Sequence, residues 1–509
     1  MRNARRISQI FFFSLFLFLF LQTTFPYLSF IPVDIFLRAD PLIAFITIIT
    51  TKQLLVGTFV LAFIILMLTI FFGRFFCGWI CPLGTVLDFS DRLTKKNRKK
   101  KSATHRKYRL WKYALFIGIV TAAIFSLQLI WFFDPISLLT RSFTASIYPL
   151  FAYLVESILN LLIKIGLFED TLYSVYDVLR GSILPVEPIF FRQSVVIILI
   201  ILTILLLGLI TKRFWCRYLC PLGALFAIFS NFRILKRTVN EDCTDCGLCY
   251  VECKMDAINK NYRSYSQIEC IECMNCVAVC PSNAVKYKIN IHKSPAKLDV
   301  TKRRLIFSGL GGLLTVGITK TAFIDKANAG AVIRPPGSLP ESEFLERCLR
   351  CHECIKICST AGKCLQPVWL ESGWEGIWTP MADARYGYCE YECNLCGFVC
   401  PTGAIHQLGL KKKQQMPIGT AYFDKSRCIP WYRNADCIVC EEHCPTPEKA
   451  IKFEIRTIKK HDGTIKEVKF PYVDENLCIG CGICVTKCPL VGKAGIFVTS
   501  ARQQRWEEE

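Results

Sequence analysis

Two cysteine-rich stretches in the middle of the chain decide its fold: CTDCGLCYVEC (Cys243–Cys253) and CIECMNCVAVCP (Cys270–Pro281). In each, three cysteines are separated by two residues and a fourth follows after three more, which is the bacterial spacing for [4Fe–4S] clusters. Three thiolates of one stretch hold one cluster, and the fourth ligates the cluster of the other. CxxC pairs also bind zinc, but the doubled four-cysteine run favours iron. We therefore predict one cluster on Cys243, Cys246, Cys249 and Cys280, and a second on Cys270, Cys273, Cys276 and Cys253.

Four more groups of this kind follow in the C-terminal part of the chain, at about 341–509. Two are regular, one has a single extra residue in its first spacer, and one has a long first spacer. They predict four further clusters, which makes six [4Fe–4S] clusters in the chain. Adjacent pairing (first group with second, third with fourth) and nested pairing (first with fourth, second with third) use the same cysteines, so both stay open. The predicted ligands are Cys348, Cys351, Cys354, Cys358, Cys389, Cys393, Cys396, Cys400, Cys428, Cys437, Cys440, Cys444, Cys478, Cys481, Cys484 and Cys488.

The composition excludes several classes of protein. The 509 residues include 29 Cys, 52% are hydrophobic and 20% are charged, against about 25% charged in a soluble domain. This favours a membrane protein and excludes disorder. A secreted disulfide scaffold is disfavoured because the chain is long and its cysteine count is odd. Haem is disfavoured because none of the six His lies in a strongly apolar segment; the single CxxCH, at Cys348–His352, falls inside one of the predicted cluster groups.

Four apolar runs, at about 9–25, 54–72, 113–133 and 194–210, are close to the roughly 20 residues with which a helix spans a bilayer. We expect all four to be transmembrane helices. The first is expected to be an anchor rather than a cleaved signal peptide, because no small-residue cleavage site follows it. The segment 41–51 is too short to span and is expected at the interface.

Charge predicts how these helices are oriented. The loop 91–112 is strongly basic, whereas the loop 134–192 has more acidic than basic residues. Because basic loops stay cytoplasmic, the N-terminus, 91–112 and the stretch after Ile210 should face the cytoplasm of an inner-membrane protein, and 26–53 and 134–192 should face out. This explains the net charge of +21 without nucleic acid as a partner.

The membrane region contains an internal repeat. RFFCGWICPLG (Arg74–Gly84) ends the second apolar run and RFWCRYLCPLG (Arg213–Gly223) ends the fourth, which indicates two duplicated helical hairpins. The two cysteines of each CxxxCP motif are four residues apart and share a helix face, which the proline then ends or bends. Two interpretations stay open: the thiols converge on one metal or redox centre, or they pack as small apolar side chains. The thiols are Cys77, Cys81, Cys216 and Cys220; the remaining cysteine, Cys364, is interpreted as a buried bystander without a partner.

A fifth, weakly apolar and glycine-rich segment covers Thr301–Lys320. Arg303–Arg304 precedes it and Ala327-Asn328-Ala329 follows, as in a twin-arginine export signal lying inside the chain. The alternative is a short amphipathic linker. We expect the segment to span, with Lys320 snorkelling to the outer interface, so that 239–288 is cytoplasmic and the C-terminal domain extracytoplasmic.

The expected fold class is therefore multi-domain, with a helical membrane domain and α+β ferredoxin-like [4Fe–4S] domains. The membrane domain should cover residues 1–235 with two duplicated hairpins. A two-cluster ferredoxin domain should cover 236–300, a twin-arginine-like transmembrane segment and linker 301–340, and a four-cluster polyferredoxin domain 341–509.

These features resemble two known families. Residues 1–300 look like the NapH-type membrane ferredoxins, with four helices, two CxxxCP motifs and a two-cluster ferredoxin. The region from about Lys302 resembles the NapG/MauM-type four-cluster ferredoxins, through Arg303–Arg304, Ile333-Arg334-Pro335-Pro336-Gly337 and Cys400-Pro401-Thr402-Gly403-Ala404. The resemblance implies a natural fusion of both that passes electrons from the membrane quinol pool to a reductase outside the cytoplasmic membrane, as a quinol dehydrogenase module.

Two other functions stay open. Related membrane ferredoxins with CxxxCP motifs are linked to cupric-ion reduction in oxidase assembly, where Cys77, Cys81, Cys216 and Cys220 would handle copper. A membrane scaffold that docks a reductase is the second, and reversible reduction by quinol would exclude it. Direct NADH oxidation is not expected, because neither a GxGxxG after a strand nor a P-loop is present.

Overall fold

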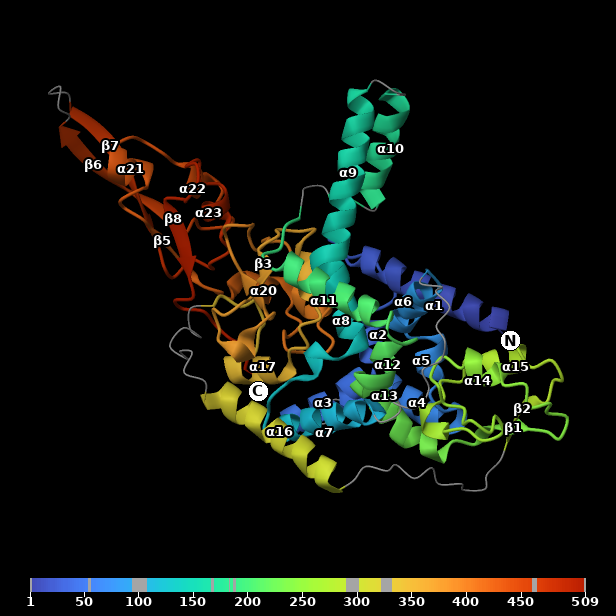
Figure 1. Cartoon of the computed structure of the whole chain (residues 1–509). Helices are drawn as coiled ribbons and strands as arrows, with labels where there is room; N and C mark the ends of the chain where they lie inside the picture. Colours follow the sequence, from blue (N-terminus) through green and yellow to red (C-terminus); the bar gives the residue numbers. More distant parts are fainter. Residues whose placement is uncertain are drawn as a thin grey trace. The chain divides into compact units, whose positions relative to one another are not determined.

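The computed structural model describes residues 2–53, 56–93, 108–165, 169–182, 184–185, 189–289, 302–321, 332–459 and 465–507. Within these ranges the chain is mostly helical, with four two-stranded antiparallel sheets (Figure 1). Several predicted features lie outside the described residues or side chains: most of the basic loop, the side chains of Arg303, Arg304 and Lys320, and Ala327-Asn328-Ala329.

The chain divides into two compact units that do not follow the expected domain boundaries. Unit 1 combines the first 21 residues with 31–143 and 195–322, so the predicted two-cluster ferredoxin is part of the same unit as the apolar helices. Unit 2 combines the C-terminal residues from Phe323 with 22–30 and 144–194.

Unit 1 is built from helices and one small sheet, and most of its apolar helices are short. Its elements are α1 (Arg2–Gln22), α2 (Ile35–Arg38), α3 (Pro41–Thr51), α4 (Val56–Phe72), α5 (Phe75–Trp79), α6 (Pro82–Leu93), α7 (Leu110–Ile124), a 3-10 helix at Ile130–Phe132, α8 (Pro135–Ser142), α11 (Ser194–Leu207), α12 (Phe214–Tyr218), α13 (Pro221–Phe229), β1 (Leu235–Val239), α14 (Leu248–Glu252), α15 (Asn275–Ala278), β2 (Val285–Ile289) and α16 (Lys302–Thr321). In the ferredoxin part β1 pairs with β2, from Leu235 opposite Ile289 to Val239 opposite Val285.

Two described helical stretches are long and apolar enough to cross a bilayer, by length and composition alone: α1 and Pro135–Lys164. The second was expected to be loop. Its apolar parts are separated by polar residues, which breaks the hydropathy pattern, but the helix continues through a π-helical turn at Phe143–Ile147. The other expected spans form shorter apolar helices, α4, α7 and α11.

Helix α3 lies in the interior of unit 1. Asp40 caps its N-terminus by accepting hydrogen bonds from the backbone N–H groups of Leu42 and Ile43, and Pro41 occupies the first turn. The side chains of Leu42 and Ile43 are fully buried. Packing against neighbouring helices places this helix in the core of unit 1. The expected interfacial position of 41–51 stays a prediction.

Unit 2 contains a helical pair and the polyferredoxin. Helices α9 (Tyr148–Lys164) and α10 (Glu169–Ser182) lie side by side (Figure 1). The polyferredoxin elements are α17 (Glu341–Arg347), α18 (Glu353–Cys358), β3 (Leu365–Pro367), β4 (Pro380–Ala382), α19 (Leu395–Phe398), α20 (Leu410–Gln415), β5 (Thr420–Phe423), α21 (Ile429–Arg433), α22 (Val439–Glu442), β6 (Ile451–Lys459), β7 (Ile465–Val473), α23 (Ile483–Thr486) and β8 (Ile496–Thr499). The pairs β3–β4, β5–β8 and β6–β7 are antiparallel.

Arg334, in the IRPPG stretch used for the family resemblance, stabilises the start of the polyferredoxin. Its guanidinium is fully buried and donates to both carboxylate oxygens of Glu341 and to the Thr379 hydroxyl. Burial favours a raised pKa for Glu341, but Arg334 and Arg505 lower this pKa below its ordinary value. Gly337 has φ +82°, and a Cβ there would lie 2.5 Å from the carbonyl oxygen of His406. The motif is therefore structural and contains no cluster ligand.

Candidate iron–sulfur sites

The regular cysteine motifs share one backbone turn. In each, the second residue after the first cysteine and the residue after the second cysteine have positive φ. A short helix then begins and carries the third cysteine in or near its first turn. The two left-handed positions coil the chain so that three thiols face one centre. The residues are Asp245 and Gly247, Glu272 and Met274, Arg350 and His352, and Gly480 and Gly482.

The fourth cysteine of each group lies beside the partner group, as the crossed arrangement requires. Cys400 shares a pocket with Cys348, Cys351 and Cys354. In the same way Cys444 shares one with the thiols of the last group. Cys428 and Cys440 of the third group each interact electrostatically with Cys488 of the fourth, and both also interact with Cys437. These groupings correspond to adjacent pairing, and none corresponds to the nested alternative.

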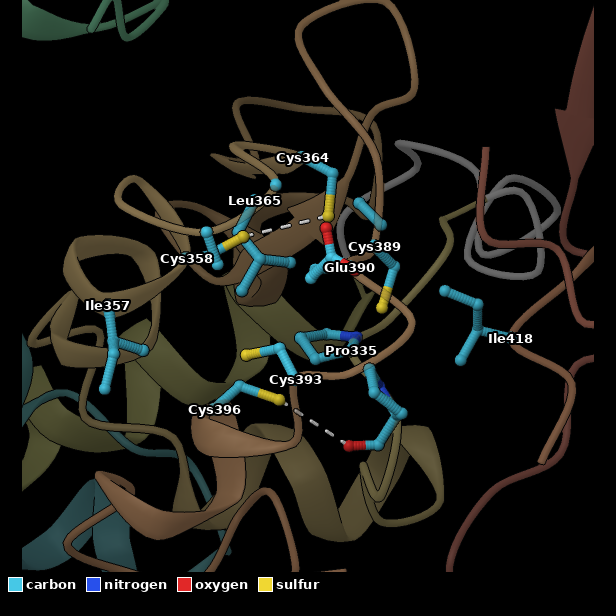
Figure 2. A pocket seen from close by; sticks show the side chains of 14 residues that line it. Pro335, Ile357, Cys358, Cys364, Leu365, Cys389, Glu390, Cys393, Cys396 and Ile418 are labelled. Atoms are coloured by element: carbon cyan, nitrogen blue, oxygen red, sulfur yellow. Dashed lines mark hydrogen bonds between the residues drawn. The ribbon is translucent and has the colours of Figure 1, made fainter. Parts of the chain in front are cut away.

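Figure 2 shows the remaining set in the polyferredoxin. Cys358 of the first group lines one pocket with Cys389, Cys393 and Cys396 of the second. Cys364 lines it too, with its Sγ 3.8 Å from the Sγ of Cys358. The expectation that Cys364 has no partner is therefore wrong: its thiol lies against two expected ligands, Cys358 and Cys389.

The two-cluster motifs are arranged in the same way in unit 1. Cys273 and Cys276 are within electrostatic range of Cys253, and Cys249 is within range of Cys243 and Cys246. The thiols Cys249 and Cys276 pack in one core with Cys253 and Cys280 around it.

The thiol sets fit iron–sulfur clusters better than single ions. Within the described ranges, no three His, Cys, Asp or Glu side chains are placed to hold one metal ion. Four thiolates around one zinc would stand about 3.8 Å apart, given Zn–S bonds of about 2.3 Å, whereas a cubane keeps its ligands farther apart. Backbone N–H groups also donate to cysteine sulfurs, from Ala257 to Cys253 at 3.2 Å and from Gly495 to Cys488 at 3.4 Å. Such N–H···S bonds stabilise the negative charge of a bound cluster.

The CxxxCP motifs form one buried group. Cys77, Cys81, Cys216 and Cys220 are each less than 10% exposed. The thiols of one repeat lie close enough to those of the other to interact electrostatically. The duplication in the sequence therefore places both pairs together, as one of the two open interpretations requires.

Buried ion pairs that are not among the sequence predictions attach the ferredoxin part to the helices of unit 1. Glu269, beside Cys270, accepts from Lys112, Arg74 and Tyr113. Burial favours a raised pKa for Glu269, but the nearby cations, Lys112 first, lower this pKa below its ordinary value. The only sequence signal was the arginine that opens each CxxxCP repeat.

A second buried carboxylate, Asp88 on α6, collects three cations. It pairs with Arg5 at 3.0 Å, Arg213 at 2.7 Å and Lys254 at 2.7 Å. Lys254 follows Cys253, so this pairing also fixes the end of a cysteine motif. A buried carboxylate without a cation would be strongly destabilising. The ion pairs of Asp88 therefore fix the N-terminus, the two repeats and the ferredoxin relative to one another within unit 1.

Comparison with known proteins supports the iron–sulfur assignment. A family model described as "4Fe-4S binding domain" matches residues 54–101, 193–239 and 396–417, and another of the same description matches 470–497. The chain is 30% identical to the methylamine utilization ferredoxin-type protein MauM of Methylorubrum extorquens over 210 residues, which are 40% of this chain and 90% of that protein. It is 33% identical to the ferredoxin-type protein NapG of Escherichia coli over 184 residues, which are 35% of this chain and 76% of that protein. No solved structure matches.

The thiol sets, their crossed grouping and these similarities agree on the chemistry. The relatives cover about 40% of the chain, so their similarity applies to that part. The prediction of [4Fe–4S] ferredoxin domains is confirmed at the level of the family. The chain belongs to the MauM/NapG-type ferredoxins and is an iron–sulfur protein of the electron-transfer type.

Proposed function

We propose that this protein is a membrane-bound conduit that takes electrons from a membrane quinol and passes them through six [4Fe–4S] clusters to a redox partner outside the cytoplasmic membrane. It would combine a NapH-like membrane part and a NapG-like polyferredoxin in one polypeptide. The observation that carries this proposal is a large apolar cavity beside the helix that contacts the two-cluster ferredoxin.

The cavity lies in unit 1 and has a volume of about 1150 Å³. Its walls come from α7, from the segment around the 3-10 helix at 129–133, and from α16. The lining is mostly apolar and includes the aromatic side chains of Trp111, Trp131 and Phe133. The volume and apolar walls suit a quinol ring with part of its isoprenoid tail, and Tyr108 and Thr315 supply hydroxyl groups for the ring oxygens.

Helix α7 connects this cavity to the ferredoxin. Arg109 follows Tyr108 of the cavity wall and donates to the backbone oxygens of Met255 and Asp256, at 3.0 and 2.7 Å. Lys112 and Tyr113 bind Glu269 from the same helix. Asp256 lies three residues after Cys253 and Glu269 directly before Cys270, both expected ligands of one cluster. The helix that lines the cavity thus also contacts the chain directly beside two ligands of that cluster.

Contacts within unit 2 support a location of the polyferredoxin outside the cytoplasm. Two regions expected on the outer side bind it directly: the outer end of the first expected span, at Phe25, and the end of the acidic 134–192 loop, at Arg192. Phe25 donates its backbone N–H to the Thr360 hydroxyl at 2.9 Å, and Arg192 pairs with Glu371 at 2.9 Å. The basic segments expected in the cytoplasm instead bind the two-cluster ferredoxin, in unit 1. Each ferredoxin thus contacts the segments expected on its own side of the membrane.

The chemistry balances with one-electron carriers. Oxidation of a quinol to the quinone releases two electrons, which bound [4Fe–4S] clusters would take one at a time, and two protons, which would pass to water. The protein side chains described above would position the quinol and bury the clusters. An oxidised redox protein must accept the electrons.

The test is anaerobic reduction of the clusters by a short-chain menaquinol, followed by their visible absorption. Ala114→Trp fills the cavity, and we expect the reduction rate by quinol to fall about tenfold or more, the equivalent of about 1.4 kcal/mol. Reduction by dithionite should be unchanged. Ile124→Trp is the matched control, because Ile124 lies on the same helix, is 57% exposed and does not line the cavity.

The outcomes separate the site from the function. If quinol fails to reduce the wild-type protein while dithionite succeeds, the quinol function is wrong. If quinol reduces wild type and Ala114→Trp equally fast, the function stands but the cavity is occupied by lipid instead.

A further inference from the structure

The two CxxxCP motifs pose a question that the six clusters do not answer. The family model for 4Fe-4S binding matches each repeat, at 54–101 and 193–239. Each repeat has only two cysteines, fewer than the four ligands of a cluster. A complete ligand set therefore requires both repeats, and the structure brings their thiols together in unit 1.

The local structure is the same in both repeats. The first cysteine lies on a five-residue helix, α5 or α12, and the second immediately precedes the proline that begins the next helix. The N–H of Gly84 donates to the Sγ of Cys81, and that of Gly223 to the Sγ of Cys220, each at 3.4 Å. These bonds fix one thiol of each repeat at a helix N-terminus, where a negative sulfur is stabilised.

Arginines cross between the repeats. Arg213, which opens the second, donates to the backbone oxygens of Cys77 and Gly84 in the first, at 2.9 and 3.1 Å. Arg74, which opens the first, reaches the turn of the second, so that a Cβ on Gly223 would lie 2.6 Å from its Nη2. Glycine in the CPLG turn thus leaves room for the opposite guanidinium.

The charges at this group are not balanced by protein groups. Both arginines are fully buried. Glu269 is shared by Arg74 and Lys112, and Asp88 by Arg213 and two other cations. The Nε and Nη2 atoms of Arg74 have no hydrogen-bond partner within the described part of the chain. A buried guanidinium with unpartnered N–H groups destabilises the folded protein. The unpartnered atoms of Arg74 therefore indicate an anion between the repeats.

We propose that Cys77, Cys81, Cys216 and Cys220 together ligate one additional iron–sulfur cluster. Four thiolates on a cluster carry net negative charge, which Arg74 and Arg213 would neutralise. A single copper or zinc ion fits less well, because the described thiols are not placed around one ion. This inference does not depend on quinol as the electron donor.

The group lies against the two-cluster ferredoxin. A Cβ on Gly78, next to Cys77, would lie 2.2 Å from the carbonyl oxygen of Ile271, between Cys270 and Cys273. The indole of Trp79 donates to the backbone oxygen of Glu272 at 2.9 Å. The additional cluster would therefore lie next to the ligand loop of an expected cubane.

Iron and acid-labile sulfide in the anaerobically purified full chain test this proposal. Six cubanes supply about 24 Fe, so we expect about 28 if the additional cluster is a cubane or about 26 if it is [2Fe–2S]. The double variants Cys77→Ser/Cys81→Ser and Cys216→Ser/Cys220→Ser should each lose the same two or four Fe. The quadruple variant should lose no more iron than either double variant, because one cluster needs ligands from both repeats. Ala44→Ser, which adds a hydroxyl at another buried position of unit 1, should keep all the iron.

Three results would overturn the proposal: about 24 Fe in wild type, full iron in either double variant, or stoichiometric copper or zinc that the double variants lose. If the variants fail to assemble, the wild-type iron count with Mössbauer spectra decides alone.

Discussion

Cys358 and Cys364 differ in role although their sulfurs are 3.8 Å apart. Cys358 ends the first C-terminal motif, yet it lies in the pocket of the second, with Cys389, Cys393 and Cys396. Cys364 belongs to no cysteine motif, and tertiary contacts alone bring it into the same pocket. Close to ligand sulfurs, a thiol of this kind can donate a weak S–H hydrogen bond. We therefore assign Cys358 to the ligands and Cys364 to the polar surroundings.

This assignment makes a prediction for one residue. Cys358→Ala should damage the cluster on Cys389, Cys393 and Cys396, and should spare the cluster on Cys348, because the fourth ligand crosses over. The measurement is iron content, with a loss of at most about four Fe, together with EPR of the reduced protein. Cys364→Ala is the control and should retain all clusters. Loss of a cluster built on Cys478 instead would support nested pairing and contradict the observed grouping.

At the scale of elements, the contact of α7 with α16 forms two walls of the proposed quinol cavity. The helices approach closely at Gly312, where a Cβ would lie 2.7 Å from the carbonyl oxygen of Gly118. Small residues permit such approaches between apolar helices. Other glycines of α16, such as Gly317, have open space around them. The glycine-rich sequence is therefore a packing feature at one position and not along the whole helix.

Gly312→Leu should separate the two helices, with a cost of about 1–3 kcal/mol from overpacking. We expect faster proteolysis of α16 and a lower rate of quinol-dependent reduction, with dithionite reduction unchanged. Gly317→Leu introduces the same side chain where nothing lies within 4 Å and should behave like wild type. Equal behaviour of the two variants would show that the helix contact is not required.

At the scale of the whole molecule, the proposed function depends on which side of the membrane each ferredoxin occupies. Cubanes are inserted in the cytoplasm, so a polyferredoxin on the other side would have to cross already folded. A cross-membrane arrangement would let one polypeptide carry electrons between compartments. If all clusters were in the cytoplasm, the protein would instead pass electrons to a soluble cytoplasmic partner.

A reporter fused after Glu509 tests this arrangement. In intact spheroplasts we expect external protease and membrane-impermeant thiol reagents to reach it, because the segments at Phe25 and Arg192, which contact the polyferredoxin, are expected outside. A reporter in the two-cluster ferredoxin, which is expected in the cytoplasm, should stay protected. Arg303→Lys/Arg304→Lys should reduce external exposure if export uses the twin arginines. A protected C-terminus that this variant leaves unchanged would exclude the cross-membrane model.

The sequence alone determined the cluster chemistry, because ligand type and spacing suffice for it: thiolates at CxxCxxC spacing can wrap a cubane wherever the motif occurs. It also determined the duplication around Cys77 and Cys216, since near-identical segments fold alike. Only the tertiary structure decided how the C-terminal groups pair, that α3 is buried, that Cys364 lies against ligands, and that Arg74 and Arg213 cross between repeats. These depend on contacts between residues far apart in the chain, for which local spacing and hydropathy carry no signal. The left-handed positions at Glu272 and Met274 belong to the same group, because neither residue favours positive φ by itself.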